Sequence, residues 1–415
     1  MLKKLEVGLT RRYRLGILLV LAAATTVGYL ARMGVSVALP FISKDFNWTL
    51  SQQGNLGGLL LGIFLVSYGV SNLFFSPYVD QFGSKKSLSV AAAAWSASLL
   101  IAAFFGGNYL IFLLSRVLLG LSQGILFPTA SKVVVGWFPV KERARANSVF
   151  LAGGPIGSLL SPMLLAPLIL QTSWQASFYV VAATGFVLVI PVLIFLADSP
   201  EDCGSNQPDA PKGKVSGLSI IEKTKSLFSD GQFRLVVLVF WGMNCIWWGV
   251  SLWLPTYLVE AAGVSMGEMA YSATIPYLGA LAGLFISSWV SDLTGNRKRI
   301  VLLSLLLQPV LFLLLALLGS PVRAVVLTLL VTIFFANNMA VPLIFAMLQS
   351  TAVEGSVGAA TGIMNGIGNG LGVAGPLSIG FVLSITGSYN LALLSLGALA
   401  VLVAIPFAFY YNPAE

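Results

Sequence analysis

The sequence has no histidine, only two cysteines and few charged residues, and each shortage removes a class of function. Charged residues make up 9% of its 415 positions, whereas soluble domains carry about 25%. Cys203 lies in a polar stretch and Cys245 in an apolar one, so they indicate neither a disulfide framework nor a metal cluster. The lack of histidine argues against a zinc or haem site. We therefore expect no metal, no cofactor and no catalytic residues, and we expect that the protein is not an enzyme.

Apolar residues are abundant instead: 57% of the chain is hydrophobic and its mean hydropathy is +0.90. Long apolar runs such as 302–318 favour membrane-spanning helices, because lipid offers no partner for backbone N–H and C=O groups. The first run, 15–39, is too long for the core of a cleavable signal peptide, so we expect it to be retained. The pattern predicts an all-α membrane protein with twelve spans, at 15–39, 53–77, 87–106, 109–135, 146–170, 176–197, 235–258, 269–290, 300–318, 322–347, 356–384 and 391–411.

Positive charge is concentrated in alternate loops. The net charge is +8, and 18 of the 23 Lys and Arg residues lie at the N-terminus and in every second loop, whereas the opposite loops hold only Lys44 and Arg323. By the positive-inside rule, the basic segments face the cytoplasm. We therefore predict a multi-pass protein of the cytoplasmic membrane with both termini in the cytoplasm. The charge then reflects topology in a lipid bilayer rather than a nucleic-acid partner.

A polar interval and an internal repeat divide the chain in two. Residues 198–232 are polar and cannot bury a core, which predicts a cytoplasmic linker between helical halves at 1–197 and 233–415. Each half carries one copy of a loop motif, at an offset of 212 residues, which predicts that the halves are parallel repeats. The copies read Ser76-x3-Asp80-x2-Gly83-x-Lys85-Lys86 and Ser288-x3-Asp292-x2-Gly295-x-Arg297-Lys298.

These motifs resemble those of the major facilitator superfamily over nearly the whole chain. The Asp-x2-Gly-x-basic-basic loop is similar to the signature between its helices 2 and 3, and Arg116-x3-Gly120-x3-Gly124 is similar to its second common motif. The resemblance implies twelve transmembrane helices in two pseudo-symmetric six-helix bundles that work by alternating access.

The resemblance assigns the motif residues to gating rather than to substrate binding. Asp80 and Asp292 would cap a neighbouring helix or pair with Arg143, which locks one conformation until the halves move apart. The same loops contain Gly83 and Gly295. Arg116 would have a structural or coupling role. The alternative is that these loops hold only topogenic charges.

Shorter motifs resemble two narrower families. Tyr29-x2-Arg32 followed by Ala38-x-Pro40 is similar to a first-helix motif shared by the anion:cation symporter family and the organophosphate:phosphate antiporter family. Residues 137–144 and 253–258 resemble the symporters more, and residues 198–204 resemble the antiporters more. Both families imply transport of organic anions, and the choice between them stays open.

Arg32 is the strongest candidate for substrate binding. Placing a charged arginine deep in an apolar helix costs free energy, so we expect its side chain to face a water-filled cavity or a partner. Its guanidinium can grip a carboxylate or a phosphate through two hydrogen bonds. Tyr29 lies one helical turn away on the same face. The alternative for Arg32 is an interhelical hydrogen bond.

Two positions depart from the symporter pattern. Gln123 and Ala31 stand where the resembling symporters carry a glutamate and an aspartate, the expected proton carriers. All 15 acidic residues of the chain lie in loops, at termini or at helix ends, and histidine is absent. The coupling ion, whether a proton, sodium or a counter-anion, therefore stays open, and so does the choice between symport, exchange and uniport.

Aromatic and amide side chains complete the predicted cavity. Rings with a polar edge suit sugar-like ligands, and amides suit hydroxyl groups, although both also join helices to one another. The residues of this kind are Asn244, Trp247, Trp248, Tyr271, Tyr277, Asn337, Asn338, Asn365 and Asn369.

The eleventh span carries a stripe of small residues. Gly362, Gly366 and Gly370 repeat every four residues, which predicts close packing against another helix. Gly375-Pro376, further along, predicts a bend.

Together these features predict a monomeric secondary transporter for a small organic anion, such as a sugar acid or another carboxylate. A phosphate-ester exchanger and a lipid or amphiphile transporter of the same fold are the alternatives. Against the phosphate-ester exchanger, the antiporters place a second arginine in span seven, where this chain has Trp247.

Overall fold

The structure, a computed structural model, describes residues 2–75, 79, 81–138, 140–197, 225, 227–318, 322–351 and 357–411. Twelve helices in this part of the chain are long and apolar enough to cross a membrane, which agrees with the twelve predicted spans. The first half contains α1 (Leu2–Asp45), α2 (Leu50–Gln52), η1 (Gln53–Gly57), α3 (Gly58–Phe74), α5 (Ser84–Phe105), α6 (Tyr109–Gln123), α7 (Leu126–Trp137), α8 (Val140–Gln171) and α9 (Trp174–Phe195). The second half contains α11 (Gly231–Glu260), α12 (Met269–Thr294), α13 (Arg297–Leu318), α14 (Arg323–Thr351), α15 (Val357–Gly370), η3 (Leu371–Val373), α16 (Ala374–Thr386) and α17 (Tyr389–Tyr410).

Three spans are interrupted rather than continuous. The second span begins as α2 and passes through a π-helical turn before α3, and the fourth is divided into α6 and α7. In the eleventh span a 3-10 turn at Leu371–Val373 separates α15 from α16. The irregular turn contains Gly372 and directly follows Gly370, while the bend at Gly375-Pro376 stays a prediction.

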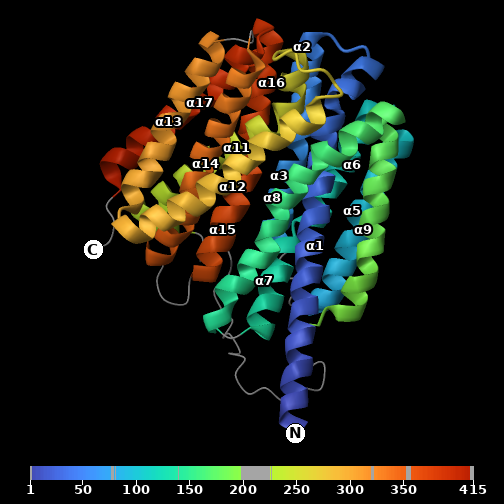
Figure 1. Cartoon of the computed structure of the whole chain (residues 1–415), viewed down its shortest axis with the longest axis vertical. Helices are drawn as coiled ribbons and strands as arrows, with labels where there is room; N and C mark the ends of the chain where they lie inside the picture. Colours follow the sequence, from blue (N-terminus) through green and yellow to red (C-terminus); the bar gives the residue numbers. More distant parts are fainter. Residues whose placement is uncertain are drawn as a thin grey trace.

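The two halves lie side by side and pack together at the end of the molecule opposite the N-terminus (Figure 1). At this end α16 packs against η1, since a Cβ atom at Gly380 would collide with the Gly54 backbone and lie 3.2 Å from the Cα of Gly58. The hydroxyl of Ser36 on α1 donates to the carbonyl of Leu252 on α11 at 2.6 Å. Backbone atoms and the small side chain of Ser36 thus contribute to the contact between the halves at this end.

The glycine stripe of the eleventh span packs against α3. A Cβ at Gly69 of α3 would lie 2.6 Å from the Cα of Gly370, and a Cβ at Gly366 would lie 2.8 Å from the Leu73 side chain. The packing prediction is confirmed for these two stripe positions. Gly362 faces open space, so its place in the stripe has no packing role.

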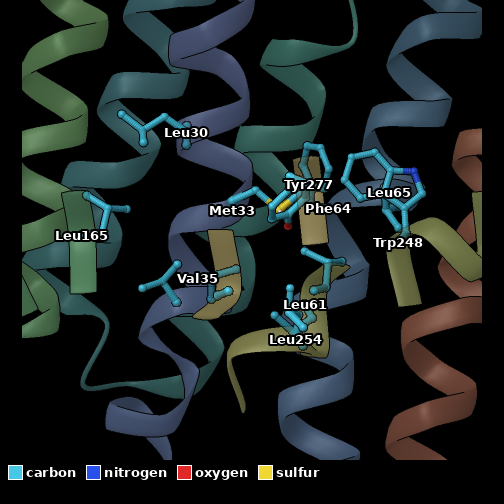
Figure 2. Packing of buried hydrophobic residues seen from close by; sticks show 14 of the residues in the cluster. Leu30, Met33, Val35, Leu61, Phe64, Leu65, Leu165, Trp248, Leu254 and Tyr277 are labelled. Atoms are coloured by element: carbon cyan, nitrogen blue, oxygen red, sulfur yellow. Dashed lines mark hydrogen bonds between the residues drawn. The ribbon is translucent and has the colours of Figure 1, made fainter. Parts of the chain in front are cut away.

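One cluster of buried hydrophobic residues continues from the first half into the second. Figure 2 shows its central part, where Met33 and Phe64 of the first half meet Trp248 and Tyr277 of the second. The centre of the bundle is therefore lined by aromatic rings from both halves.

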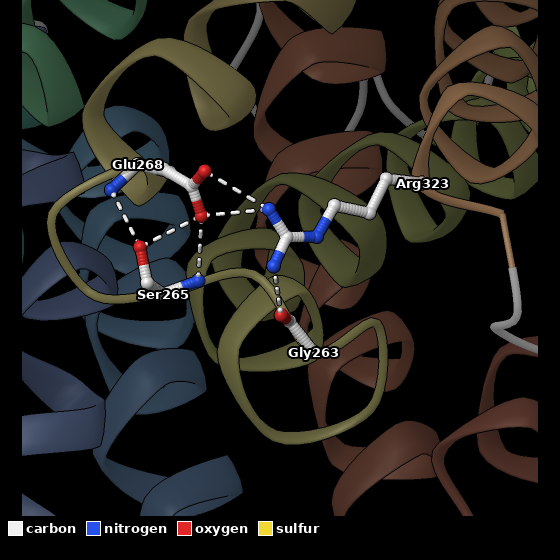
Figure 3. A network of polar contacts seen from close by, with 4 residues as sticks. All are labelled: Gly263, Ser265, Glu268 and Arg323. Atoms are coloured by element: carbon white, nitrogen blue, oxygen red, sulfur yellow. Dashed lines mark hydrogen bonds and ion pairs between the residues drawn. The ribbon is translucent and has the colours of Figure 1, made fainter.

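A network of hydrogen bonds ties the loop between α11 and α12 to Arg323 at the start of α14 (Figure 3). The Arg323 Nη1 donates to both carboxylate oxygens of Glu268 at 2.9 Å, and its Nη2 donates to the Gly263 carbonyl at 3.0 Å. Hydrogen bonds from Ser265, and then the charge of Arg323, hold the pKa of the Glu268 carboxyl below its ordinary value. The side chain of Lys44 reaches the same loop, with Nζ 3.9 Å from the sulfur of Met266.

Candidate functional site

Arg32 lies in the middle of α1 and is 1% exposed. Its Nε donates to Oε1 of Gln123, the last residue of α6, at 2.7 Å. The Gln123 amide is fixed in turn, because its Nε2 donates to the Gly28 carbonyl at 3.2 Å. An amide oxygen accepts this hydrogen bond without bringing a negative charge, so the charge of Arg32 stays uncompensated by Gln123.

Aromatic rings surround the Arg32 guanidinium. Its central carbon lies 4.6 Å from the ring centroids of both Tyr29 and Tyr68, 5.3 Å from that of Phe64 and 5.8 Å from that of Phe127. Rings at these distances attract a cation through their π faces. We call this arrangement, Arg32 with its four rings, the arginine cage. It draws on α1, α3 and α7.

One edge of the Arg32 guanidinium has no protein partner. Its Nη2 is buried and makes no hydrogen bond with any described residue. A buried donor left unpaired is costly, and arginine matches the two oxygens of a carboxylate. The cage therefore presents a donor to an anion.

Arg116 on α6 lies close to the same site and is 3% exposed. Its Nε donates to the Leu60 carbonyl of α3 at 3.3 Å, and its central carbon lies 5.3 Å from the Phe64 centroid. Its Nη2 is also buried without a partner among the described residues. Two guanidinium groups thus lie beside one phenyl ring.

Trp248 of α11 extends the cage into the second half. Its ring stacks on Tyr29, with centroids 6.3 Å apart and an angle of 20°. It also meets Phe64 edge to face, and Figure 2 shows both of these side chains. Its Nε1 donates to Oδ1 of Asn369 at 3.1 Å, and the Asn369 Nδ2 donates to the Asn365 carbonyl at 3.0 Å. The predicted residues Asn365 and Asn369 are therefore joined to the cage through a tryptophan.

The structure places the other predicted cavity residues apart from Arg32. Trp247 packs edge to face against Tyr277 and Phe334, with centroids 5.9 and 5.5 Å away. Tyr277 reaches α1 only at the sulfur of Met33, 4.0 Å from its hydroxyl. The Asn244 amide donates to the Phe240 carbonyl of its own helix at 2.8 Å. Trp247, Tyr277 and Phe334 thus form a second aromatic group, and Asn244 is bonded to its own helix.

Tyr68 lies against the Arg32 guanidinium but was not among the predicted residues. It is an aromatic residue in an apolar span, which is an ordinary core pattern. Trp248 was predicted only as one of several cavity residues of its span, with no distinct place beside Arg32.

The predicted gating residues are only partly described. Gly83 and Gly295, 212 positions apart, both have positive φ, 80° and 67°, a conformation that glycine adopts without strain. Asp80 and the side chains of Arg143 and Asp292 lie outside the described residues, so the latch stays a prediction. At the end that holds the N-terminus, Arg14 of α1 pairs with Glu142 of α8 at 3.6 Å.

No group of three metal-ligating side chains occurs among the described residues. The candidate site consists of buried cations, hydrogen-bond donors and aromatic rings.

Sequence comparison decides the family. The Major Facilitator Superfamily profile matches residues 21–376 and, in a second, overlapping match, residues 263–415. The chain belongs to this superfamily. It is therefore a multi-pass secondary transporter and not an enzyme, as the motifs predict.

Several relatives of this chain are named as transporters of small organic acids. It is 28% identical to the hexuronate transporter of Bacillus subtilis, covering 96% of this chain and 95% of that protein. It is 27% identical to the probable sulfoacetate transporter SauU of Cupriavidus necator, covering 94% and 93%. Relatives of this kind are typical of the anion:cation symporter family, so the predicted resemblance is confirmed.

A solved major facilitator structure shares the fold. A bacterial homologue of the human lysosomal transporter Spinster, in an inward-facing and unoccupied conformation, superimposes with a TM-score of 0.74. The sequences are 18% identical, and the match covers 96% of each chain. The predicted fold of two six-helix bundles is thereby confirmed, while the exact bounds 1–197, 198–232 and 233–415 stay predictions.

Proposed function

We propose that this transporter carries a small organic anion, a sugar acid of the hexuronate type, across the cytoplasmic membrane by alternating access. The observation that carries the proposal is the arginine cage, in which a buried guanidinium keeps one donor edge free of protein partners. A carboxylate satisfies that edge and neutralises the charge. The 28% identity to a hexuronate transporter supports the choice of substrate.

The second half of the chain would recognise the rest of the substrate. Trp248 offers a flat ring beside Tyr29, and Asn365 and Asn369 offer amide groups that suit hydroxyls. The anion would bind to the first half and the hydroxyl-bearing end to the second. A ligand held by both halves favours the closed state that alternating access requires.

We propose that the protein works as a monomer, since both sides of the site come from one chain. The basic end, which holds the N-terminus and Arg14, would face the cytoplasm, and the end with Lys44 and Arg323 the opposite side. Labelling intact cells with an impermeant maleimide tests this orientation, since Arg323→Cys should react and Glu142→Cys should not.

Thermal stabilisation of the purified protein tests the substrate class. D-galacturonate and sulfoacetate should raise the melting temperature of the wild type by a few degrees at about 100 times Kd, but not that of Arg32→Ala. Arg234→Ala, at the exposed start of α11, is the matched control and should respond like the wild type.

The same panel distinguishes the alternatives. Stabilisation by glycerol 3-phosphate alone would favour a phosphate-ester carrier, for which the second arginine, Arg116, is the supporting observation. Stabilisation by lysophosphatidylcholine alone, in both proteins alike, would favour an amphiphile carrier and contradict the role of Arg32.

A further inference from the structure

The two arginines of the site have no counter-charge inside the bundle. Among the twelve spans, acidic residues occur only as the last residue of two, Asp45 and Glu260, and the chain has no histidine. Neither Arg32 nor Arg116 forms an ion pair with a described residue, and both have a buried Nη2 without a partner. The titratable groups whose rings face Arg32 are the phenols of Tyr29 and Tyr68.

During alternating access, the unpaired positive charge of the two arginines raises the free energy of the closed state. A carrier that changes sides passes through a state in which its central site is closed to both, and water is then excluded from the site. Desolvated guanidinium groups without a counter-charge are strongly unfavourable. A change of protonation at the nearest side chain cannot neutralise Arg32. The group 2.7 Å from the Arg32 Nε is the amide of Gln123, which does not titrate.

We infer that this transporter is an obligate exchanger of anions, in which only the anion-loaded form changes sides. This inference rests on the proposed function. A bound carboxylate supplies the counter-charge that the interiors of the described spans lack, so each organic anion that enters is matched by another that leaves. Proton and sodium gradients do not drive the cycle.

The test uses purified wild-type protein in liposomes and radiolabelled D-galacturonate as the probe. Uptake into liposomes preloaded with unlabelled galacturonate should exceed uptake into empty liposomes by at least about tenfold. An inward proton or sodium gradient should cause no accumulation in empty liposomes. Accumulation driven by either gradient would overturn the inference while leaving the proposed function intact.

A substituted glutamine provides the second test. Gln123→Glu places a carboxylate beside Arg32 and should permit net uptake into empty liposomes. Gln308→Glu is the matched control, because Gln308 is equally buried and also donates to a backbone carbonyl, that of Ile333, at 3.1 Å on the other half. It should remain an exchanger only.

Three results would contradict the inference or its basis. Net uptake by the Gln308 variant as well as the Gln123 variant would show that the counter-charge beside Arg32 is not the cause. A folded Gln123→Glu variant that exchanges galacturonate but shows no net uptake would likewise exclude the counter-charge beside Arg32 as the cause. Absence of galacturonate and sulfoacetate transport in every arm would overturn the proposed function itself.

Discussion

Arg32 of α1 and Gln123 of α6 are joined by a hydrogen bond of 2.7 Å between two fully buried side chains 91 residues apart. The bond orients the guanidinium so that its Nε is satisfied while its Nη2 stays without a protein partner. Gln123 thus acts as a neutral support for the charged group that is proposed to bind the substrate. This relationship determines the first prediction.

Arg32→Lys should weaken galacturonate binding by at least about tenfold, although it keeps the charge. An ammonium group cannot make the two parallel hydrogen bonds of a guanidinium, and it loses the planar contact with the rings of the cage. Titration of the purified protein with galacturonate measures the change. Arg234→Lys is the control. An unchanged Kd in Arg32→Lys would contradict binding of the carboxylate through two hydrogen bonds from the guanidinium.

Trp248→Phe should raise the KM for galacturonate more than that for sulfoacetate. The phenyl ring can still stack on Tyr29, but the hydrogen bond to Asn369 is lost, and with it the orientation of an amide proposed to contact hydroxyls. Exchange kinetics with both substrates measure the ratio. Trp241→Phe is a matched control on the same helix, because the Nε1 of Trp241 donates to the Leu371 carbonyl at 3.0 Å instead. Equal effects on both substrates would assign Trp248 to packing alone.

Gly380→Val should separate the two halves at the end opposite the N-terminus. Its side chain would collide with the backbone of Gly54, which cannot move without displacing η1. In a background without native cysteines, Ser384→Cys should then react faster with a maleimide. Gly362→Val is the control, since Gly362 faces open space. Faster labelling in both variants would contradict the steric explanation.

Glu268→Gln should flatten the dependence of stability on pH under acid conditions. The folded protein lowers the pKa of this carboxyl, so its contribution is present above the ordinary value of 4.5 and is lost as the pH falls through the lower folded value. Melting temperatures between pH 6 and pH 3, on the order of this window, should therefore decline less steeply in the variant. An identical decline would mean that the network in Figure 3 contributes nothing to stability.

The fold could be predicted well from the sequence, because every backbone N–H and C=O group inside a bilayer must be hydrogen-bonded within the protein. Twelve apolar runs each needed a helix, and two copies of one loop motif placed glycine where the chain takes a positive φ, at Gly83 and Gly295. The irregular turns within three spans were not predicted. Helical periodicity does not register a single irregular turn such as Leu371–Val373.

The candidate site was predicted in part. Arg32 stood out because a charge in an apolar run is costly, and Tyr29 followed from its helical spacing. Trp248 and Tyr68 could not be identified in this way, since their significance comes from contact with residues of other helices. For the same reason, the sequence did not separate Trp247 from the cage.

Arg32 contacts both sides of the break in the fourth span. Gln123 is the last residue of α6 and Phe127 lies in the first turn of α7, so one guanidinium touches the two parts that Gly124 and Ile125 separate. A carboxylate bound at the Nη2 edge, as proposed, would therefore be held by the one residue that joins these two parts.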